Sequence, residues 1–130
     1  MGRKQPVVIR RPLVSVVDDD ESLRDSLPDL VREFGYSAQA FSSAEAFLAS
    51  DYVDQPGCLI LDVAMPGMTG PDLQRELMRR RKVIPIIFIT ADRDTTLRQR
   101  LIEQGAEECL FKPFSDTALL EAVNSALNPK

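Results

Sequence analysis

The feature that most constrains the fold of this chain is a regular alternation between short apolar runs and longer segments with helical periodicity. Most of the apolar runs are rich in valine, isoleucine or leucine, which is typical of strands buried on both faces of a parallel sheet. The pattern therefore predicts a doubly wound α/β fold, in which right-handed crossovers place five helices around a five-stranded parallel sheet. The predicted strands are Leu13 to Val17, Ser37 to Phe41, Cys58 to Leu61, Ile84 to Ile89 and Glu108 to Phe111.

The predicted helices have recognisable boundary residues. Asp20 is a suitable N-cap for the first helix, and Gly35 is a suitable end. Pro28 lies too deep in this helix to be a first-turn proline, so it should remove a backbone hydrogen bond to Arg24 and kink the helix. The apolar face of the first helix is predicted to contain Leu23, Leu27, Leu30, Val31 and Phe34. The other predicted helices run from a capping box at Ser42 to Glu45 as far as Ala49, from Pro71 to Arg81, from Asp94 to Gln104, and from a cap at Ser115 to Leu127.

Length and composition limit the possible classes of protein. The 130 residues fit one domain, predicted over residues 13–128, after a flexible basic tail over residues 1–12. The chain has no histidine, which excludes Ser-His-Asp and Cys-His catalysis and histidine-ligated zinc. Its two cysteines predict reduced thiols in a cytoplasmic protein. No apolar run approaches the ~20 residues of a membrane helix, and a net charge of −4 gives no domain-wide basic surface for nucleic acid.

Polar residues follow four of the predicted strands. Asp18 and Asp19 follow the first strand, Asp62 the third, Thr90 the fourth and Lys112 the fifth. In an open parallel sheet the ligand site lies beyond the carboxyl ends of the strands, so these side chains should meet at one edge. The acids come together if the first strand lies between the second and the third, which corresponds to the strand order 2-1-3-4-5 of a flavodoxin-like sheet.

Such a cluster has an electrostatic consequence. Three carboxylates about 5 Å apart repel one another by about 3 kcal/mol per pair at an effective dielectric of 20, and Lys112 compensates only one charge. The cluster should therefore shift its pKa values or bind a divalent cation. Oxygen ligands without histidine or thiolate favour Mg²⁺, or Mn²⁺ in its place. Asp62 is then the candidate nucleophile for a phosphoryl group, with Thr90 and Lys112 as donors to the phosphoryl oxygens.

Four ordered motifs resemble the receiver (CheY-like) domain of two-component response regulators. The helix and loop sequences are most similar to those in receivers of nitrogen-fixation and nodulation regulators. The motifs are Val16 to Asp20, Leu61 to Gly70, Phe88 to Ala91 and Phe111 to Phe114. The resemblance covers residues 13–127. It implies a response regulator that accepts a phosphoryl group on Asp62 from a sensor histidine kinase, in a magnesium-dependent reaction.

The resemblance also implies individual roles. Asp19 and Asp62 would bind Mg²⁺ directly, Asp18 through water, and Ala64 through its backbone carbonyl. Thr90 and Lys112 would hold the phosphoryl oxygens, helped by the backbone N–H groups of Val63 and Ala91, and the Lys112–Pro113 peptide would be cis. Phosphorylation would pull Thr90 inward and switch the face built from Asp94 to Gln104, Glu108 to Phe111 and the last helix. That face would control an output domain or form a homodimer, with Arg98, Glu103 and Glu107 as candidates for cross-dimer pairs.

The sequence departs from the family pattern at the switch. Receivers carry an aromatic residue three positions before the lysine, whereas this chain has Cys109 there. A thiol cannot fill the same pocket, so we expect the switch to rely on backbone shifts instead of a side-chain movement at this position. Ala64 and Asp92 occupy two positions expected to guide the hydrolytic water, and Pro28 lies in the helix on which sensor kinases dock.

Two alternatives remain at this point. A degenerate receiver would bind partners without being phosphorylated, and failure to bind beryllofluoride would favour it. A haloacid-dehalogenase-like phosphatase would use Asp18 as its nucleophile, but the segment from Asp18 to Ser22 lacks the expected glycine and threonine. As a receiver the chain is not an enzyme beyond slow self-dephosphorylation. Nucleic acid would be contacted only through an output domain, and none follows Leu127, so the chain is either a stand-alone receiver or a piece of a longer regulator.

Overall fold

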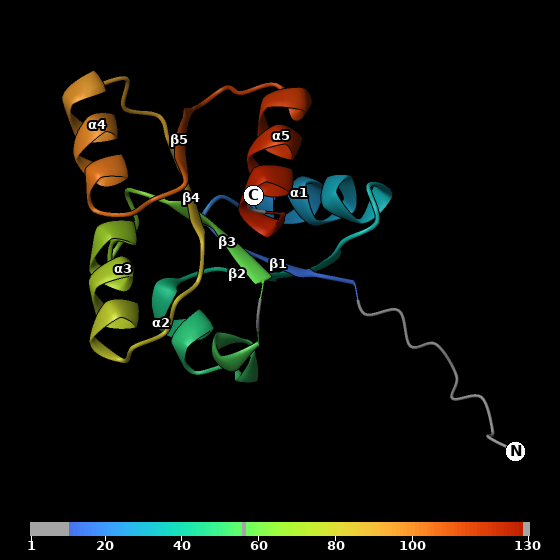
Figure 1. Ribbon diagram of the computed structural model, residues 1–130, viewed down its shortest axis with the longest axis horizontal. Coiled ribbons are helices and arrows are strands. Elements are labelled where there is room, and N and C mark those ends of the chain that lie inside the picture. Colours follow the sequence, from blue (N-terminus) through green and yellow to red (C-terminus); the bar gives the residue numbers. More distant parts are fainter. Residues whose placement is uncertain (1–10, 56, 129–130) are drawn as a thin grey trace, which may run out of the picture.

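The computed structural model describes residues 11–55 and 57–128, which form one parallel sheet with helices on both faces (Figure 1). The strands lie in the order β2-β1-β3-β4-β5, as predicted. The fold class and the strand order are therefore confirmed, whereas most of the predicted tail lies outside the described residues. The strands are β1 (Leu13–Val17), β2 (Ser37–Phe41), β3 (Gly57–Asp62), β4 (Ile86–Thr90) and β5 (Glu108–Phe111).

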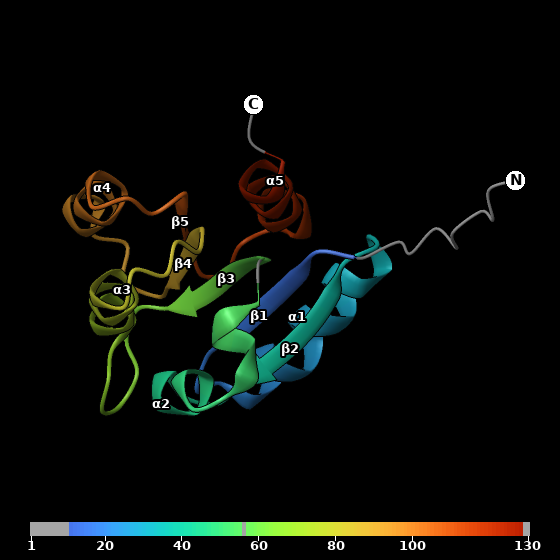
Figure 2. The ribbon, with the colours of Figure 1, turned by 60° about the horizontal axis from the view of Figure 1, so that its bottom comes forward.

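The helices divide between the two faces of the sheet. In Figures 1 and 2, α1 and α5 cover one face, while α2, α3 and α4 cover the other. A short 3-10 helix, η1, follows α2 in the connection to β3. The bounds are α1 (Glu21–Glu33), α2 (Ala44–Leu48), η1 (Asp51–Asp54), α3 (Gly70–Arg79), α4 (Thr95–Glu103) and α5 (Asp116–Leu127).

The central strands supply the core on both faces because successive side chains point in opposite directions. Val14, Ile60 and Ile87 belong to the cluster beneath α1 and α5. Leu59 and Phe88 belong to the cluster beneath α2, α3 and α4. Every residue of β1 and β4 is buried, which explains why apolar residues do not alternate with exposed polar ones in these strands. Burial of each such side chain contributes about 1.5–3 kcal/mol, so the sheet is a rigid support for the residues at its carboxyl edge.

Two predictions for the helical segments are wrong. Phe34 is the C-cap of α1 rather than part of its apolar face, and it is 60% exposed. The N-cap of α2 is Ser43 rather than Ser42, so Glu45 does not complete a capping box. Both differences concern a single residue at a helix end, where the boundary is least determined by the local sequence.

Other boundaries differ by a few residues for clear reasons. β4 begins at Ile86, because the carbonyl of Pro85 still accepts a hydrogen bond from Leu59 but proline has no N–H to donate. α3 ends at Arg79, and Arg81 then adopts a positive φ of 58°. α1 passes through the buried Pro28 without interruption, and the kink there stays a prediction.

Candidate functional site

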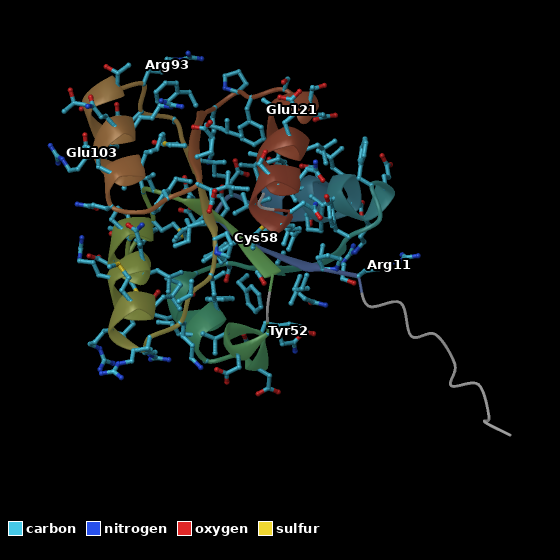
Figure 3. All side chains as sticks on the ribbon, in the orientation of Figure 1. Arg11, Tyr52, Cys58, Arg93, Glu103 and Glu121 are labelled. Carbon is cyan, nitrogen blue, oxygen red and sulfur yellow. The ribbon has the colours of Figure 1, made fainter. Side chains whose placement is uncertain are left out.

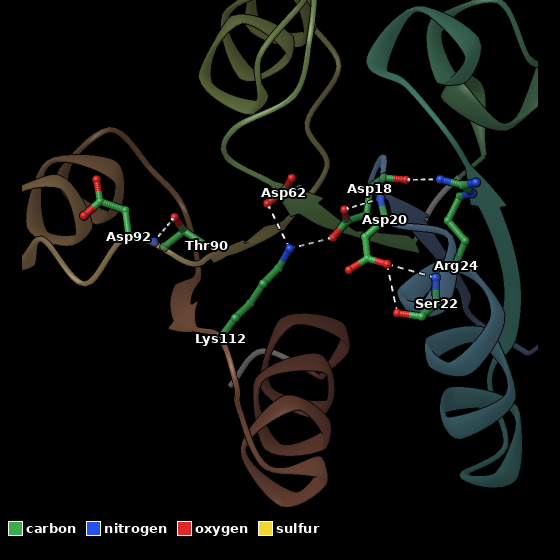
Figure 4. A network of polar contacts seen from close by, with 8 residues as sticks. All are labelled: Asp18, Asp20, Ser22, Arg24, Asp62, Thr90, Asp92 and Lys112. Atoms are coloured by element: carbon green, nitrogen blue, oxygen red, sulfur yellow. Dashed lines mark hydrogen bonds and ion pairs between the residues drawn. The ribbon is translucent and has the colours of Figure 1, made fainter.

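Four of the predicted site residues lie together at the carboxyl edge of the sheet in Figure 4: Asp18, Asp62, Thr90 and Lys112. β1 and β3 are neighbours with Val17 in register with Leu61, so the acids that follow these residues come side by side. Asp18, Asp19 and Asp62 each place a carboxylate oxygen within 4.8 Å of the others. The convergence of these three acids confirms the placement expected from the strand order.

The acids differ in exposure, and one cation neutralises part of their charge. Asp18 is fully buried, Asp62 is 5% exposed and Asp19 is exposed. The Lys112 Nζ donates to Asp18 Oδ2 at 3.1 Å and to Asp62 Oδ1 at 3.3 Å. Two charges from three carboxylates therefore remain uncompensated, and a pair 4.8 Å apart repels by about 3.5 kcal/mol at an effective dielectric of 20.

This crowding changes the protonation of the site. Burial, together with the negative charge of Asp18, raises the pKa of Asp62 to about 6, although Lys112 acts in the opposite direction. Burial lowers the pKa of Lys112, but its bonds to Asp18 and Asp62 outweigh this effect and raise the pKa above its ordinary value. At neutral pH Asp62 is thus mostly ionised beside the charged ammonium of Lys112, and an added cation would relieve the repulsion on its carboxylate.

The loop after β1 is held by its own hydrogen bonds. Asp18 Oδ1 accepts the backbone N–H of Asp20 at 2.9 Å, and Arg24 Nη1 donates to the Asp18 carbonyl at 3.0 Å. Asp20 accepts both the N–H and the hydroxyl of Ser22, and these bonds lower its pKa. Asp20 is therefore the helix cap that was predicted. The anchoring by Arg24 was not predicted, although its position one turn after Asp20 is a possible signal in the sequence.

Thr90 reaches the site edge, but its hydroxyl is held away from the acids. The side chain is 2% exposed, and Oγ1 accepts the backbone N–H of Asp92 at 3.0 Å. Figure 4 shows this hydroxyl on the side of Asp92, while Lys112 lies between Asp62 and Asp18. The N–H of Val63 donates to the Ile89 carbonyl at 3.0 Å, so its expected bond to a phosphoryl oxygen would have to replace this one and stays a prediction. The Lys112–Pro113 peptide is cis, as expected.

The loop after Asp62 has a support that sequence reasoning missed. Glu45 Oε2, from α2, accepts the backbone N–H of Met68 at 3.2 Å. Gly67 has a φ of 74°, and a Cβ there would lie 2.7 Å from the same carboxylate oxygen. The loop that carries the exposed Ala64 is thus tied to α2. No local pattern predicts this contact, because it joins residues 23 positions apart.

The cysteines and the expected dimer residues make contacts within the chain. Cys109 is 2% exposed in the core cluster that contains Phe88, and burial raises its pKa. Arg98 donates to Glu108 Oε1 at 2.5 Å and to the Cys109 carbonyl at 3.1 Å, so it joins α4 to β5 inside one molecule. Glu103 accepts from Gln99 at 3.1 Å. Arg98 therefore has a partner within the chain, and the cross-dimer pairs stay a prediction.

Comparison with known proteins decides the family. The model of the response regulator receiver domain matches residues 14–124. The chain belongs to the response regulator receiver family. This receiver is 46% identical over 116 residues to nodulation protein W of Bradyrhizobium diazoefficiens, a match that covers 89% of this chain and 51% of that protein. It is 42% identical over 118 residues to the response regulator protein TodT of Pseudomonas putida, with 91% of this chain and 52% of TodT covered.

Solved structures agree with this assignment. A low-resolution structure of the response regulator StyR has a TM-score of 0.83 and 44% identity, covering 90% of this chain and 59% of that one. The crystal structure of FixJ-N has a TM-score of 0.81 and 36% identity, covering 91% of this chain and 94% of that one. The receiver spans about half the length of the curated relatives it matches. Within the described residues, no helix has the length and apolar character to cross a membrane.

The family assignment confirms the similarity to regulators of the nodulation type. Receivers are signalling domains, and several relatives carry names of transcriptional regulators. The family match therefore favours a receiver over the phosphatase alternative. The arrangement of Asp18, Asp19 and Asp62 suits a divalent cation chemically, because all three offer carboxylate oxygens and one of them is exposed to solvent.

Proposed function

We propose that this receiver accepts a phosphoryl group on Asp62 from a sensor histidine kinase and thereby controls an output domain or partner. The single observation that carries the proposal is the three-carboxylate cluster within 4.8 Å, with the Lys112 ammonium bonded to Asp18 and Asp62. A carboxylate that is nearly buried beside a fixed cation has both a nucleophilic oxygen and a donor for the oxygens of an incoming phosphoryl group.

The proposed transfer is balanced within the two partners. A carboxylate oxygen of Asp62 forms a bond to phosphorus, the bond from phosphorus to the kinase histidine nitrogen breaks, and the leaving imidazole nitrogen takes up a proton. Lys112 is 3.3 Å from Asp62 and can turn from the carboxylate to a phosphoryl oxygen while keeping its bond to Asp18. Asp62 must be ionised to attack, so transfer should weaken as the pH falls below its pKa of about 6.

The residues present fit a magnesium ion, or Mn²⁺ in its place. Asp19 and Asp62 would ligate the ion, Asp18 would hold one of its waters, and the carbonyl of Ala64 would complete the protein ligands. The positive charge of the ion would stabilise the negative charge on the phosphoryl oxygens during transfer. The anchoring of the Asp18 loop by Arg24 and of the Ala64 loop by Glu45 would keep both sides of this ligand set in place.

Phosphorylation would act on the face formed by α4, β5 and α5. Thr90 joins the site to this face, since it ends β4 and its carbonyl accepts the N–H of Lys112 at 2.7 Å. An inward turn of the Thr90 hydroxyl would give it a phosphoryl partner in exchange for Asp92. A coupling free energy of about 1–3 kcal/mol between phosphorylation and this face would change partner affinity about 5–150-fold. The partner would be an output domain or a second copy of the chain.

The test is phosphorylation in a defined mixture. The chain is incubated with Mg²⁺ and a small-molecule phosphoryl donor, and its intact mass is measured with and without the substitution Asp62→Asn. We expect one acid-stable, base-labile phosphoryl adduct on the wild type, none on Asp62→Asn, and none with a chelator. A wild type that gains no adduct and binds no beryllofluoride would contradict the proposal and support the degenerate receiver.

A further inference from the structure

The ring of Phe111 lies where the end of β4 meets the loop before α4. Phe111 is in register with Thr90 across the β4–β5 ladder, and the next residue, Lys112, donates its N–H to the Thr90 carbonyl. The guanidinium carbon of Arg93 lies 5.9 Å from the centroid of the Phe111 ring, within the range of a cation–π contact. Arg93 is exposed beside the start of α4, where Figure 3 labels it.

The loop that carries Arg93 is attached to Thr90 by hydrogen bonds. Thr90 Oγ1 accepts the N–H of Asp92 at 3.0 Å, and Asp92 Oδ1 accepts the N–H of Asp94 at 3.0 Å. Asp94 is the N-cap of α4 and accepts the N–H of Thr96 at 2.9 Å. A short chain of bonds therefore leads from the threonine hydroxyl to the first turn of the helix. The loop is fixed at two points, the Thr90 hydroxyl and the Phe111 ring.

The aromatic surface on this side of β5 comes from Phe111 rather than from position 109. Cys109 and Phe111 are two residues apart in β5, so their side chains leave the same face of the sheet. Cys109 is 2% exposed and packs in the core, whereas Phe111 is only half-buried and lies one pleat closer to the site. The half-buried Phe111 ring can lose its contact with a cation while the core stays packed. The buried Cys109 thiol cannot move without disturbing the core.

We propose that Arg93 and Phe111 act as positioning residues that hold the loop before α4 in its unphosphorylated arrangement and make its release depend on Thr90. This inference rests on the proposed function and specifies its regulation. In the resting state the Asp92 N–H has Thr90 as its acceptor, and the contact between Arg93 and Phe111 holds the same loop. When the hydroxyl turns toward Asp62, the Asp92 N–H loses that acceptor, and the ring contact is the remaining restraint to be broken.

The direction of the effect follows from this arrangement. A contact made only in the resting state opposes any ligand that requires the other state. Removal of either the guanidinium or the ring should therefore tighten the binding of a phosphoryl mimic. An exposed cation–π contact has the strength to change that affinity by about two- to fivefold. The affinity for Mg²⁺ alone should stay unchanged, because the acids lie on other strands and bind the ion without moving Thr90.

The experiment titrates the full chain with beryllofluoride in saturating Mg²⁺, and separately with Mg²⁺ alone, by calorimetry. The variants are Arg93→Gln, Phe111→Leu and the two combined. Arg93→Lys and Phe111→Tyr keep a cation and a ring, and should behave like the wild type. Arg100→Gln removes another exposed arginine, one that lies within α4, and serves as the matched control.

We expect each disruptive variant to bind beryllofluoride about two- to fivefold more tightly, and the combined variant to show no larger gain, because either substitution already removes the contact. Unchanged mimic affinity in both single variants, or gains that simply multiply in the combined one, would overturn the inference while leaving the proposed function intact. A wild type that binds Mg²⁺ but not beryllofluoride would instead refute the proposed function, and the inference with it. A parallel change in Mg²⁺ affinity would show general loosening of the site and would also overturn the inference.

Discussion

Replacement of Asp62 by asparagine should stabilise the metal-free protein at neutral pH, although it removes the proposed phospho-acceptor. The pKa of Asp62 is about 6 in the folded chain against an ordinary value of 3.8. Because the folded state holds the proton more tightly, ionisation of Asp62 removes stability as the pH rises through the interval between these values. The difference of about two units corresponds to a limit of about 3 kcal/mol, at 1.36 kcal/mol per unit.

Asparagine cannot ionise, so it should avoid this loss while Lys112 keeps its bond to Asp18. We expect Asp62→Asn to raise the free energy of unfolding by about 1–3 kcal/mol at pH 7.5, with the gain disappearing near pH 4. For a domain of this size that gain corresponds to about 3–12 °C in Tm. The assay is urea and thermal unfolding from pH 4 to 8 with a chelator present.

Asp25→Asn removes an exposed acid from α1 and should change stability little at any pH. Saturating Mg²⁺ should stabilise the wild type more than Asp62→Asn, because the variant has lost a ligand. An Asp62→Asn protein that is no more stable than the wild type at pH 7.5, or a gain that is equal at pH 4 and pH 7.5, would refute the reasoning.

Three further predictions concern the rest of the molecule. Gly67→Ala should lower the free energy of unfolding by about 1–2 kcal/mol, because the residue has a positive φ and a Cβ there would meet the Glu45 carboxylate. Urea unfolding measures this loss, and an unchanged midpoint would contradict the prediction. Cys58 and Cys109 should resist a thiol reagent in the native protein and react after unfolding, since both are buried and burial raises the pKa of Cys58 to about 12. Rapid labelling of the native protein would contradict this prediction. Phe34→Ala should change stability by less than about 0.5 kcal/mol, because the side chain is 60% exposed, and a loss typical of a core residue would contradict it.

The sheet and the convergence of the acids were predictable because they depend on local signals and one topological rule. The apolar run ending at Val17 and the run ending at Leu61 each specify a strand without reference to the rest of the chain. Polar residues that follow such strands must lie at the same edge, whatever the details of the helices. The positions of Asp18 and Asp62 relative to Lys112 followed from that rule together with the strand order 2-1-3-4-5.

The supports of the site were not predictable in the same way. The bond from Glu45 to Met68 depends on how α2 packs against a loop that is distant in sequence. Ser43 rather than Ser42 is the N-cap of α2, so the capping box predicted at Ser42 to Glu45 does not form. The contact between Arg93 and Phe111 likewise requires the positions of a loop and a strand. Sequence patterns specify what a segment can form, and the tertiary packing specifies which of its polar groups meet.

The most direct test of the account is a titration of the chain with Mn²⁺ followed by the loss of backbone amide signals in NMR spectra. Paramagnetic broadening acts on amides close to the ion, so the account predicts early loss of the signals around Asp19 and Ala64, with Leu13 and Gly57 at the opposite edge of the sheet unaffected. Asp62→Asn should require much more Mn²⁺ for the same loss. Uniform broadening, or selective broadening at any other part of the chain, would contradict the claim that these acids form a cation site.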